Sequence, residues 1–310
     1  MRLTLGPVLF NWPAARWRDF YFRIADEAAV DTVVVGEVVC SKRTPFLAEA
    51  TPLVIDRLRR AGKEVVLASL ALVTLERERR GVAALSSSAG LMVEANDVSG
   101  LAALAGRPHA VGPLIQVYNE DTAGYLARRG ARRISLAAEL PASAIARIVA
   151  AVPETTVEVL AFGRAPLAIS VRCYHARAEG LSKDNCRFVC ERDPDGMTVE
   201  TLDREPFVAV NGLQTLSHAC VDLAGEADWL AAIGVGALRL SPQTCDMVMV
   251  ADQFRRVLDG AAAPDEALAA LRAAFPQAPH ANGFLYGRPG MSWVARDDAA
   301  PAPPAHSAAS

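Results

Sequence analysis

Three of the six cysteines in this chain lie close together in one stretch. Cys173, Cys186 and Cys190 follow the spacing C-x12-C-x3-C. Thiols gathered this tightly in an otherwise intracellular-looking sequence are more naturally metal ligands than disulfide partners, because cytosolic thiols are kept reduced. The stretch therefore predicts a metal centre that needs further ligands from elsewhere in the chain.

The fourth thiol ligand must be chosen from Cys40, Cys220 and Cys245. Geometry favours Cys40, because it follows a predicted strand at the end of the fold from which the cysteine stretch also leaves. Cys220 lies in an apolar run and Cys245 enters a predicted helix, where thiols commonly serve as small hydrophobic side chains. Four thiolates can hold zinc or an iron–sulfur cluster. Structural zinc sites usually pair their cysteines at short spacing, and only one short pair exists here, so the spacing favours iron while zinc and metal-free thiols remain alternatives.

Other side chains that could take part in chemistry are isolated charges. Glu37 ends a hydrophobic strand, where it could act as an acid or base, anchor a substrate, or be purely structural. Arg43 and Arg164 could each bind a carboxylate or pyrophosphate through two hydrogen bonds, or form ordinary salt bridges. His175 and His218 could support a metal ligand or lie in solvated loops. The sequence has no G-x-S-x-G elbow and no H-E-x-x-H helix, which removes two common routes to hydrolysis.

The elements that must position these residues alternate between short β-branched runs and amphipathic segments. This alternation implies parallel strands with right-handed crossovers. Eight such units predict a (β/α)8 TIM-like barrel, with a doubly wound open sheet as the alternative, although no strand leads into a G-x-G-x-x-G turn. The expected strands are residues 3–9, 32–37, 64–69, 90–94, 113–118, 133–138, 156–162 and 237–240. The expected helices are residues 16–29, 46–61, 72–85, 98–104, 121–129, 142–150 and 224–233.

The alternation breaks once, between the seventh and eighth strands. This interval, residues 164–236, is predicted to be an insertion into a barrel formed by residues 1–260. It carries the cysteine stretch and a hairpin, which is indicated by the turn at 193–196 and the run 206–210. Because functional side chains gather at the carboxyl ends of barrel strands, the insertion should cover the same mouth that Cys40 faces. Residues 261–298 are expected to form an extension with one weak helix, and residues 299–310 a disordered tail.

Composition and charge narrow the function classes. Hydrophobic residues make up 52% of the chain and charged residues 22%, as expected for a folded globular protein. The net charge of −3 offers no basic field for a phosphate backbone, so nucleic acid is not expected as a partner. No apolar run is long enough for a membrane span, and the first residues lack a signal-peptide cleavage site, so we expect a cytoplasmic location.

Several segments resemble one known family. They are LGPVLFNWP from Leu5, VVVGEVVCSKR from Val33, QVYNEDT from Gln116, the cysteine stretch with the DPDG that follows it, and NGLQTLSHACVDL from Asn211. Over most of its length the chain is similar to the ubiquinone-biosynthesis branch of the collagenase-like peptidase family, the UbiV-like proteins.

The resemblance implies properties that spacing alone does not. UbiV-like proteins bind a [4Fe–4S] cluster through four cysteines, which correspond here to Cys40, Cys173, Cys186 and Cys190. They form a heterodimer with a homologous UbiU-like subunit and work with a lipid-carrier-type accessory protein. The pair is implicated in oxygen-independent ring hydroxylation of a polyprenyl phenol, with prephenate as the proposed hydroxyl donor, and protease activity is not expected. The competing hypotheses are a peptidase or RNA-modification relative that shares the barrel, and a zinc-stabilised binding protein.

Overall fold

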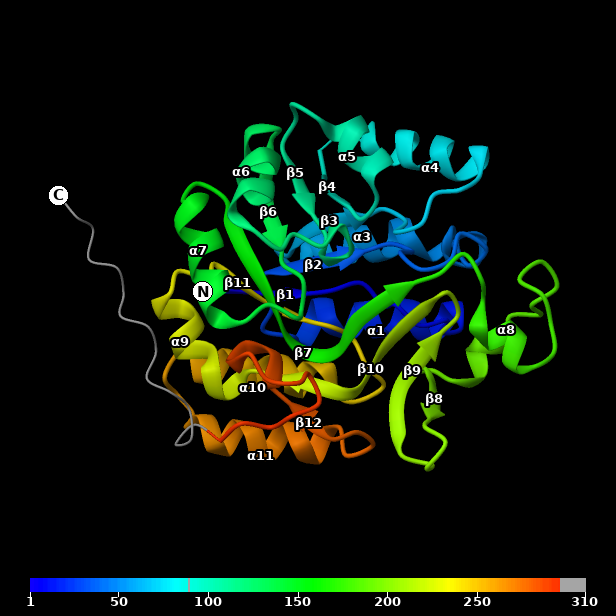
Figure 1. Ribbon diagram of the computed structural model, residues 1–310. Coiled ribbons are helices and arrows are strands. Elements are labelled where there is room, and N and C mark those ends of the chain that lie inside the picture. Colours follow the sequence, from blue (N-terminus) through cyan, green and yellow to red (C-terminus); the bar gives the residue numbers. More distant parts are fainter. Residues whose placement is uncertain (89, 296–310) are drawn as a thin grey trace.

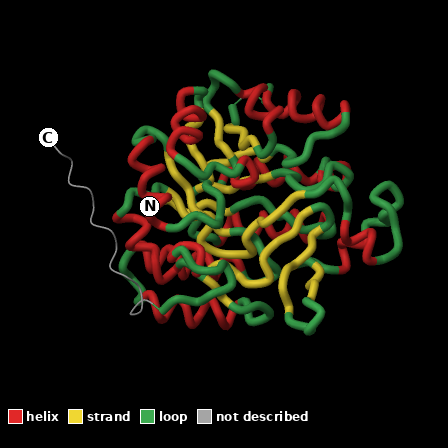
Figure 2. The backbone as a smooth tube through the Cα atoms, in the orientation of Figure 1, coloured by secondary structure: helices red, strands yellow, loops and turns green. Residues whose placement is uncertain are grey.

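A computed structural model describes residues 1–88 and 90–295. In this part of the chain, eight parallel strands close into a barrel surrounded by helices (Figure 1, Figure 2). Closure is complete because the last barrel strand pairs with both the first and the seventh. The predicted (β/α)8 barrel is therefore confirmed, and the open sheet is excluded. The barrel strands are β1 (Arg2–Leu5), β2 (Thr32–Val35), β3 (Glu64–Ala68), β4 (Met92–Ala95), β5 (His109–Val111), β6 (Ala131–Ser135), β7 (Thr156–Ile169) and β11 (Ala237–Leu240).

The outer helices pack against one face of each strand, since side chains alternate between the two faces. Leu3, Val33 and Val35 belong to the main core together with helix residues such as Trp17. Val34 belongs instead to a smaller cluster of buried residues. The helices are α1 (Ala14–Glu27), α2 (Thr44–Leu47), α3 (Ala50–Arg60), α4 (Glu76–Ser86), α5 (Val98–Leu104), α6 (Glu120–Arg128), α7 (Ala142–Ala151), α9 (Ala227–Ala232), α10 (Met247–Leu258) and α11 (Pro264–Ala274). None of the described helices is long and apolar enough to cross a membrane.

The predicted fifth strand is wrong. Residues 113–118 do not form a strand; β5 lies earlier, and Pro113–Ile115 form a short 3-10 helix, η1. Pro113 cannot donate to a strand ladder, and Gln116 has a φ of 58°, which is incompatible with an extended chain. The predicted helix 46–61 is also divided in two, because α2 ends before α3 begins.

The segment between β7 and β11 adds an antiparallel layer to the barrel. Strand β7 is longer than predicted because its second half pairs antiparallel with β10. The elements of this segment are α8 (Tyr174–Ala178), η2 (Val189–Arg192), β8 (Met197–Glu200), β9 (Pro206–Asn211), β10 (Gln214–Asp222) and η3 (Ala224–Glu226). The expected hairpin is present as β8–β9, but the turn at residues 193–196 precedes β8 instead of joining the two strands.

The chain after β11 folds back onto the molecule. Helix α11 packs against α10, and the short strand β12 (His280–Ala281) pairs with β10, followed by η4 (Gly283–Tyr286). In Figure 1, α8 and its neighbouring loop project from one side of the barrel, away from this C-terminal part. The predicted tail, residues 299–310, lies outside the described residues.

Candidate functional site

Four cysteines line one small cavity, which we call the thiol cavity. Cys40, Cys173, Cys186 and Cys190 share its wall with Arg43 and other residues, and its volume is about 20 Å³. The four cysteines come from two segments that are far apart in sequence, the turn after β2 and the insertion after β7. They meet because both segments leave the barrel from the carboxyl ends of its strands.

Local structure explains how each segment reaches the cavity. The chain turns after β2 at Gly36, which has a φ of 142°. A β-carbon there would lie 2.7 Å from the carbonyl oxygen of Ala68, so only glycine fits. In the insertion, Cys173 immediately precedes α8 and Cys190 lies in η2. Cys190 is buried, and the other three cysteines are partly exposed.

The cysteines do not converge on one point. Among the described residues, no group of three or more His, Cys, Asp or Glu side chains is arranged to hold a single metal ion. Burial raises the pKa of the thiols of Cys40 and Cys173, although Arg43 opposes this shift at both. Without a metal, therefore, these two thiols are held in the protonated form.

Arg43 is a buried cation in the wall of the thiol cavity. Its Nη1 donates to the carbonyl oxygen of Leu9 at 2.8 Å, and its Nη2 donates to Oδ1 of Asn211 at 3.0 Å. Burial alone would lower the pKa of Arg43, but Glu37, Cys190 and Cys40 raise it above its ordinary value. Arg43 thus stays charged beside two of the thiols.

Glu37 holds the turn that carries Cys40. Its Oε1 accepts hydrogen bonds from the backbone N–H of Val39 at 2.8 Å and of Cys40 at 2.9 Å, and lies 3.9 Å from Nη1 of Arg43. Burial raises the pKa of Glu37, while Arg43 and the two N–H groups oppose the shift. Its contacts in the described structure are those of a residue that positions the cysteine turn.

His175 connects α8 by hydrogen bonds to the segments that contain Gly212 and Asp193. Its Nδ1 accepts the backbone N–H of Gly212 at 2.9 Å, so the proton is on Nε2, which lies 3.0 Å from Oδ2 of Asp193. Burial lowers the pKa of His175 even though Asp193 opposes the shift, and the ring is therefore neutral at pH 7. Both ring nitrogens are engaged, and Gly212 itself lines the cavity. His218, the other histidine considered from the sequence, lies on β10.

Arg164 does not reach the thiol cavity but lines a second cavity at the barrel mouth, about 30 Å³ in volume, with Asn96, Gln214 and Arg239. Its Nη1 donates to the carbonyl oxygens of Ser217 and His218. Within the described structure, Nε of Arg164, Oδ1 of Asn96 and Nε2 of Gln214 are buried without a hydrogen-bond partner. Such atoms usually find a partner, so the barrel mouth is suited to a small polar ligand or water.

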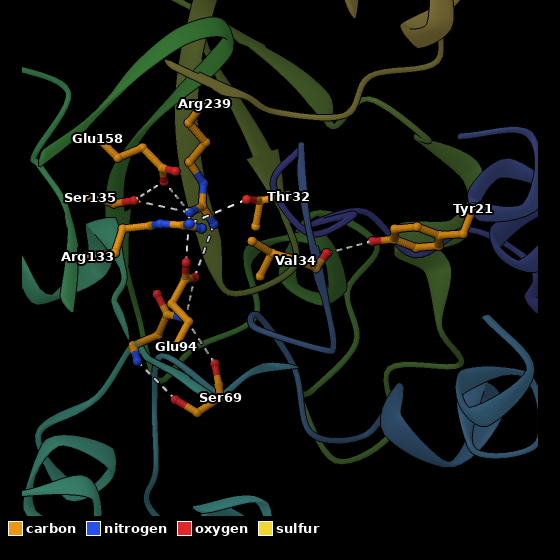
Figure 3. Close-up of polar contacts among 10 residues, drawn as sticks. Tyr21, Thr32, Val34, Ser69, Glu94, Arg133, Ser135, Glu158 and Arg239 are labelled. Carbon is orange, nitrogen blue, oxygen red and sulfur yellow. Dashed lines mark hydrogen bonds and ion pairs between the residues drawn. The ribbon is translucent and has the colours of Figure 1, made fainter. Parts of the chain in front are cut away.

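The sequence analysis missed an ion network inside the barrel (Figure 3). Arg239 on β11 contacts Glu94 through both terminal nitrogens, at 2.7 and 3.1 Å, and its Nη1 lies 2.8 Å from Oε1 of Glu158. Ser135 contributes a further contact to the arginine at 3.1 Å. Arg239, Glu94 and Glu158 each lie between two apolar residues of a strand. In an open sheet this pattern usually indicates a side chain that faces solvent, but in a closed barrel the same face forms the interior. A single charged residue in an otherwise apolar strand was the sequence signal that could have predicted this network.

The fold and its buried site define a TIM-barrel protein with a thiol-lined cavity at the carboxyl ends of its strands. The sequence profile of peptidase family U32 matches residues 20–295. The chain therefore belongs to peptidase family U32.

Two solved structures resemble the chain at low sequence identity. A U32 peptidase shares 14% identity, with 78% of this chain and 93% of that chain covered and a TM-score of 0.45. A dihydrodipicolinate synthase from Aquifex aeolicus shares 8% identity, with 89% and 82% covered and a TM-score of 0.41. Neither likeness bears on the activity of this chain.

Proposed function

We propose that this chain is an iron–sulfur protein that holds a [4Fe–4S] cluster through Cys40, Cys173, Cys186 and Cys190. The observation that carries the proposal is the gathering of these four cysteines, from two distant segments, around one cavity. A cluster with four thiolate ligands is anionic overall, and Arg43 supplies a fixed positive charge beside it. Hydrogen bonding and charge near the ligands tune such centres, so Arg43 is expected to stabilise the reduced form.

The spacing of the cysteines favours a cluster over a single zinc ion, because structural zinc sites usually pair their cysteines at short spacing and only one short pair exists here. Zinc draws its four ligands to one centre, whereas irons and sulfides separate the thiolates of a cluster. The thiols in the described structure surround a cavity and do not converge on an ion site. The cavity is small, so cluster binding requires the cysteine side chains to move apart; Cys40, Cys173 and Cys186 are partly exposed.

We further propose that the chain acts in oxygen-independent ring hydroxylation of a polyprenyl phenol in ubiquinone biosynthesis. The support is the sequence resemblance, which also suggests a UbiU-like partner subunit, a lipid-carrier-type accessory protein and prephenate as hydroxyl donor. Hydroxylation without O₂ needs another source of the oxygen atom, which is the role proposed for prephenate, and a bound cluster would supply one-electron transfer. Of the two arginines considered for an anionic donor, Arg164 is the better candidate, because it lines the cavity at the barrel mouth, whereas Arg43 lies in the wall of the thiol cavity.

The competing hypothesis is a peptidase, as the family name suggests. The histidine nearest in sequence to the clustered cysteines, His175, has both ring nitrogens engaged and is not free to activate a thiol as a nucleophile. We therefore expect no peptide hydrolysis by the purified chain.

Anaerobic growth tests the proposed function. Cells that lack this gene should accumulate the unhydroxylated quinone precursor without oxygen, and the wild-type gene should restore quinone. Cys186→Ala should fail to restore it, whereas the control Cys245→Ala, which changes a cysteine outside the thiol cavity, should succeed. Full restoration by Cys186→Ala, or hydrolysis of unstructured peptides by purified wild-type protein, would overturn the assignment.

A further inference from the structure

A large cavity lies outside the barrel, between α3 and α4. Its volume is about 610 Å³, which is within the range of small-molecule sites. Helix α3 packs mainly against α1, and α4 packs mainly against α5, so these two neighbours in the helical ring have few contacts with each other. The space between them reaches β2 and β3 at Val35, Leu67 and Ala68, and we call it the α3–α4 cavity.

The surface that the α3–α4 cavity offers to a ligand is mainly apolar. Val35, Ile55, Leu67, Leu70, Val82 and Leu85 supply hydrocarbon. Several wall hydroxyls are already bonded within the protein. Ser41 donates to Glu78 at 2.6 Å, and Thr51 donates to the carbonyl oxygen of Leu47 at 2.7 Å. An enclosed ligand therefore gains mainly from burying hydrocarbon.

The charged side chains of the wall differ in how many polar partners they have. Glu37 lies beside Arg43 and accepts two backbone N–H groups. Glu78 accepts the backbone N–H of Thr74 at 2.8 Å and of Leu75 at 2.9 Å in addition to the Ser41 hydroxyl. Burial would raise the pKa of Glu78, but these donors hold it below its usual value, so its charge is kept and satisfied.

Arg77 is the remaining charge in the wall. It stands in the first turn of α4, is exposed, and has no ion pair or hydrogen bond with another residue of the described structure. The nearby acid Glu76 is instead paired with Arg79 and Arg80. Of the three charged side chains in this wall, Arg77 is therefore the one without a polar partner in the described structure.

We propose that the α3–α4 cavity binds a single-chain amphiphile, with its hydrocarbon chain between the helices and an anionic head at Arg77. The inference does not rest on the proposed function, because none of the four cysteines lines this cavity. It rests on the volume, the satisfied polar wall groups and Arg77, a cation with no polar partner in the described structure. Carboxylate and phosphate heads share the required chemistry, and the experiment separates them.

Calorimetric titration of the full chain with dodecanoate, dodecyl phosphate and dodecanol, each below its micelle-forming concentration, tests the proposal. Whichever of dodecanoate and dodecyl phosphate binds more tightly shows whether the head group is a carboxylate or a phosphate. That anion should bind about five-fold more tightly than dodecanol, as expected for an exposed ion pair. Decanoate should bind about fifteen-fold more weakly than dodecanoate, because it buries two fewer methylene groups. Arg77→Gln should remove the preference for the anions and leave dodecanol binding unchanged.

Gly81→Leu locates the binding site. Gly81 lines the α3–α4 cavity and a β-carbon there meets no atom within 4 Å, so this larger side chain should weaken dodecanoate binding more than ten-fold. Gly124→Leu on α6 is the control, since its β-carbon meets only the flexible end of Arg128, at 3.3 Å. Both changes should raise helix stability alike.

Three results would overturn the proposal. They are absence of binding by every probe, equal binding by Gly81→Leu and wild type, and an anion preference that survives Arg77→Gln. Sedimentation adds a fourth, because a dimer of the wild-type chain that dissociates in Gly81→Leu would mean that a second copy fills the cavity.

Discussion

Replacing Arg239 with methionine should unbalance the ion network inside the barrel. In the wild-type protein the guanidinium lies between Glu94 and Glu158, and the side chains of both acids are almost completely buried, with 2% and 0% exposed. Methionine fills similar space but removes the cation that both acids contact. The change therefore isolates an electrostatic loss from a packing loss.

The expected magnitude follows from burial. Removing one partner of a buried ion pair leaves an uncompensated charge and typically costs about 3–5 kcal/mol. Against a total stability of about 5–15 kcal/mol for a folded domain, this loss is a large fraction of the total. Arg239→Lys keeps the charge and loses the two-nitrogen contact to Glu94, so it should cost clearly less than Arg239→Met.

The loss should depend on pH. Burial would raise the pKa of Glu158, but Arg239, Arg133 and hydrogen bonds hold it below its ordinary value. In wild type, therefore, ionised Glu158 stabilises the fold above the unfolded pKa of about 4.3, and this contribution is lost as pH falls through the folded pKa. Without Arg239, burial is less opposed and the pKa of Glu158 rises, so the variant regains stability as pH falls toward about 5.

Urea unfolding of both proteins at about pH 8 and pH 5 measures this effect. We expect the difference in free energy of unfolding to be larger at the higher pH. Adding Glu94→Gln and Glu158→Gln to Arg239→Met should restore part of the lost stability, because no buried charge then remains unpaired. A loss below about 1 kcal/mol, or one that is the same at both pH values, would refute the reasoning.

Three further outcomes concern the thiol cavity. Arg43→Gln should make the reconstituted protein lose its visible absorbance faster in air than wild type, because the cluster loses its neighbouring cation; equal decay would contradict the role of Arg43. Gly212→Ala should lower the free energy of unfolding by about 1–2 kcal/mol and by more than Gly260→Ala. Both glycines have positive φ, 63° and 69°, but only at Gly212 does a β-carbon approach Nη2 of Arg43, at 3.0 Å, so equal losses would argue against this contact. Wild type should lose stability as pH falls below about 6.5, since unfolded His175 binds a proton there and the folded ring, whose pKa is lowered, does not. His175→Phe should show a shallower pH dependence in thermal unfolding, and an unchanged slope would contradict the neutral assignment.

The barrel was predictable because strand and helix signals alternate along most of the chain. The failures have one local cause and one distant cause. Residues 113–118 contain an apolar run typical of a strand, but Pro113 and the left-handed conformation at Gln116 prevent pairing there. The length of β7 was not predictable from local pattern, because its second half is extended by pairing with β10, a contact between distant segments.

The candidate site was predictable in part. Spacing drew attention to Cys173, Cys186 and Cys190, and strand order suggested that Cys40 faces the same mouth. The roles of the arginines could not be predicted from the sequence, because these roles depend on burial and on hydrogen-bond partners. Arg43 is fixed beside the thiols, whereas Arg164 lies in the barrel mouth. Arg239 escaped notice because an alternating strand does not reveal which face becomes the interior of a closed barrel.

The most direct test of the central claim is the iron, acid-labile sulfide and zinc content of protein purified without oxygen. Wild type should hold about four irons and about four sulfides per chain, and no stoichiometric zinc. Cys40→Ala should lose the iron and sulfide, while Cys245→Ala should keep both, since Cys245 does not line the thiol cavity. Stoichiometric zinc in wild type, or iron and sulfide that persist in Cys40→Ala, would contradict the account.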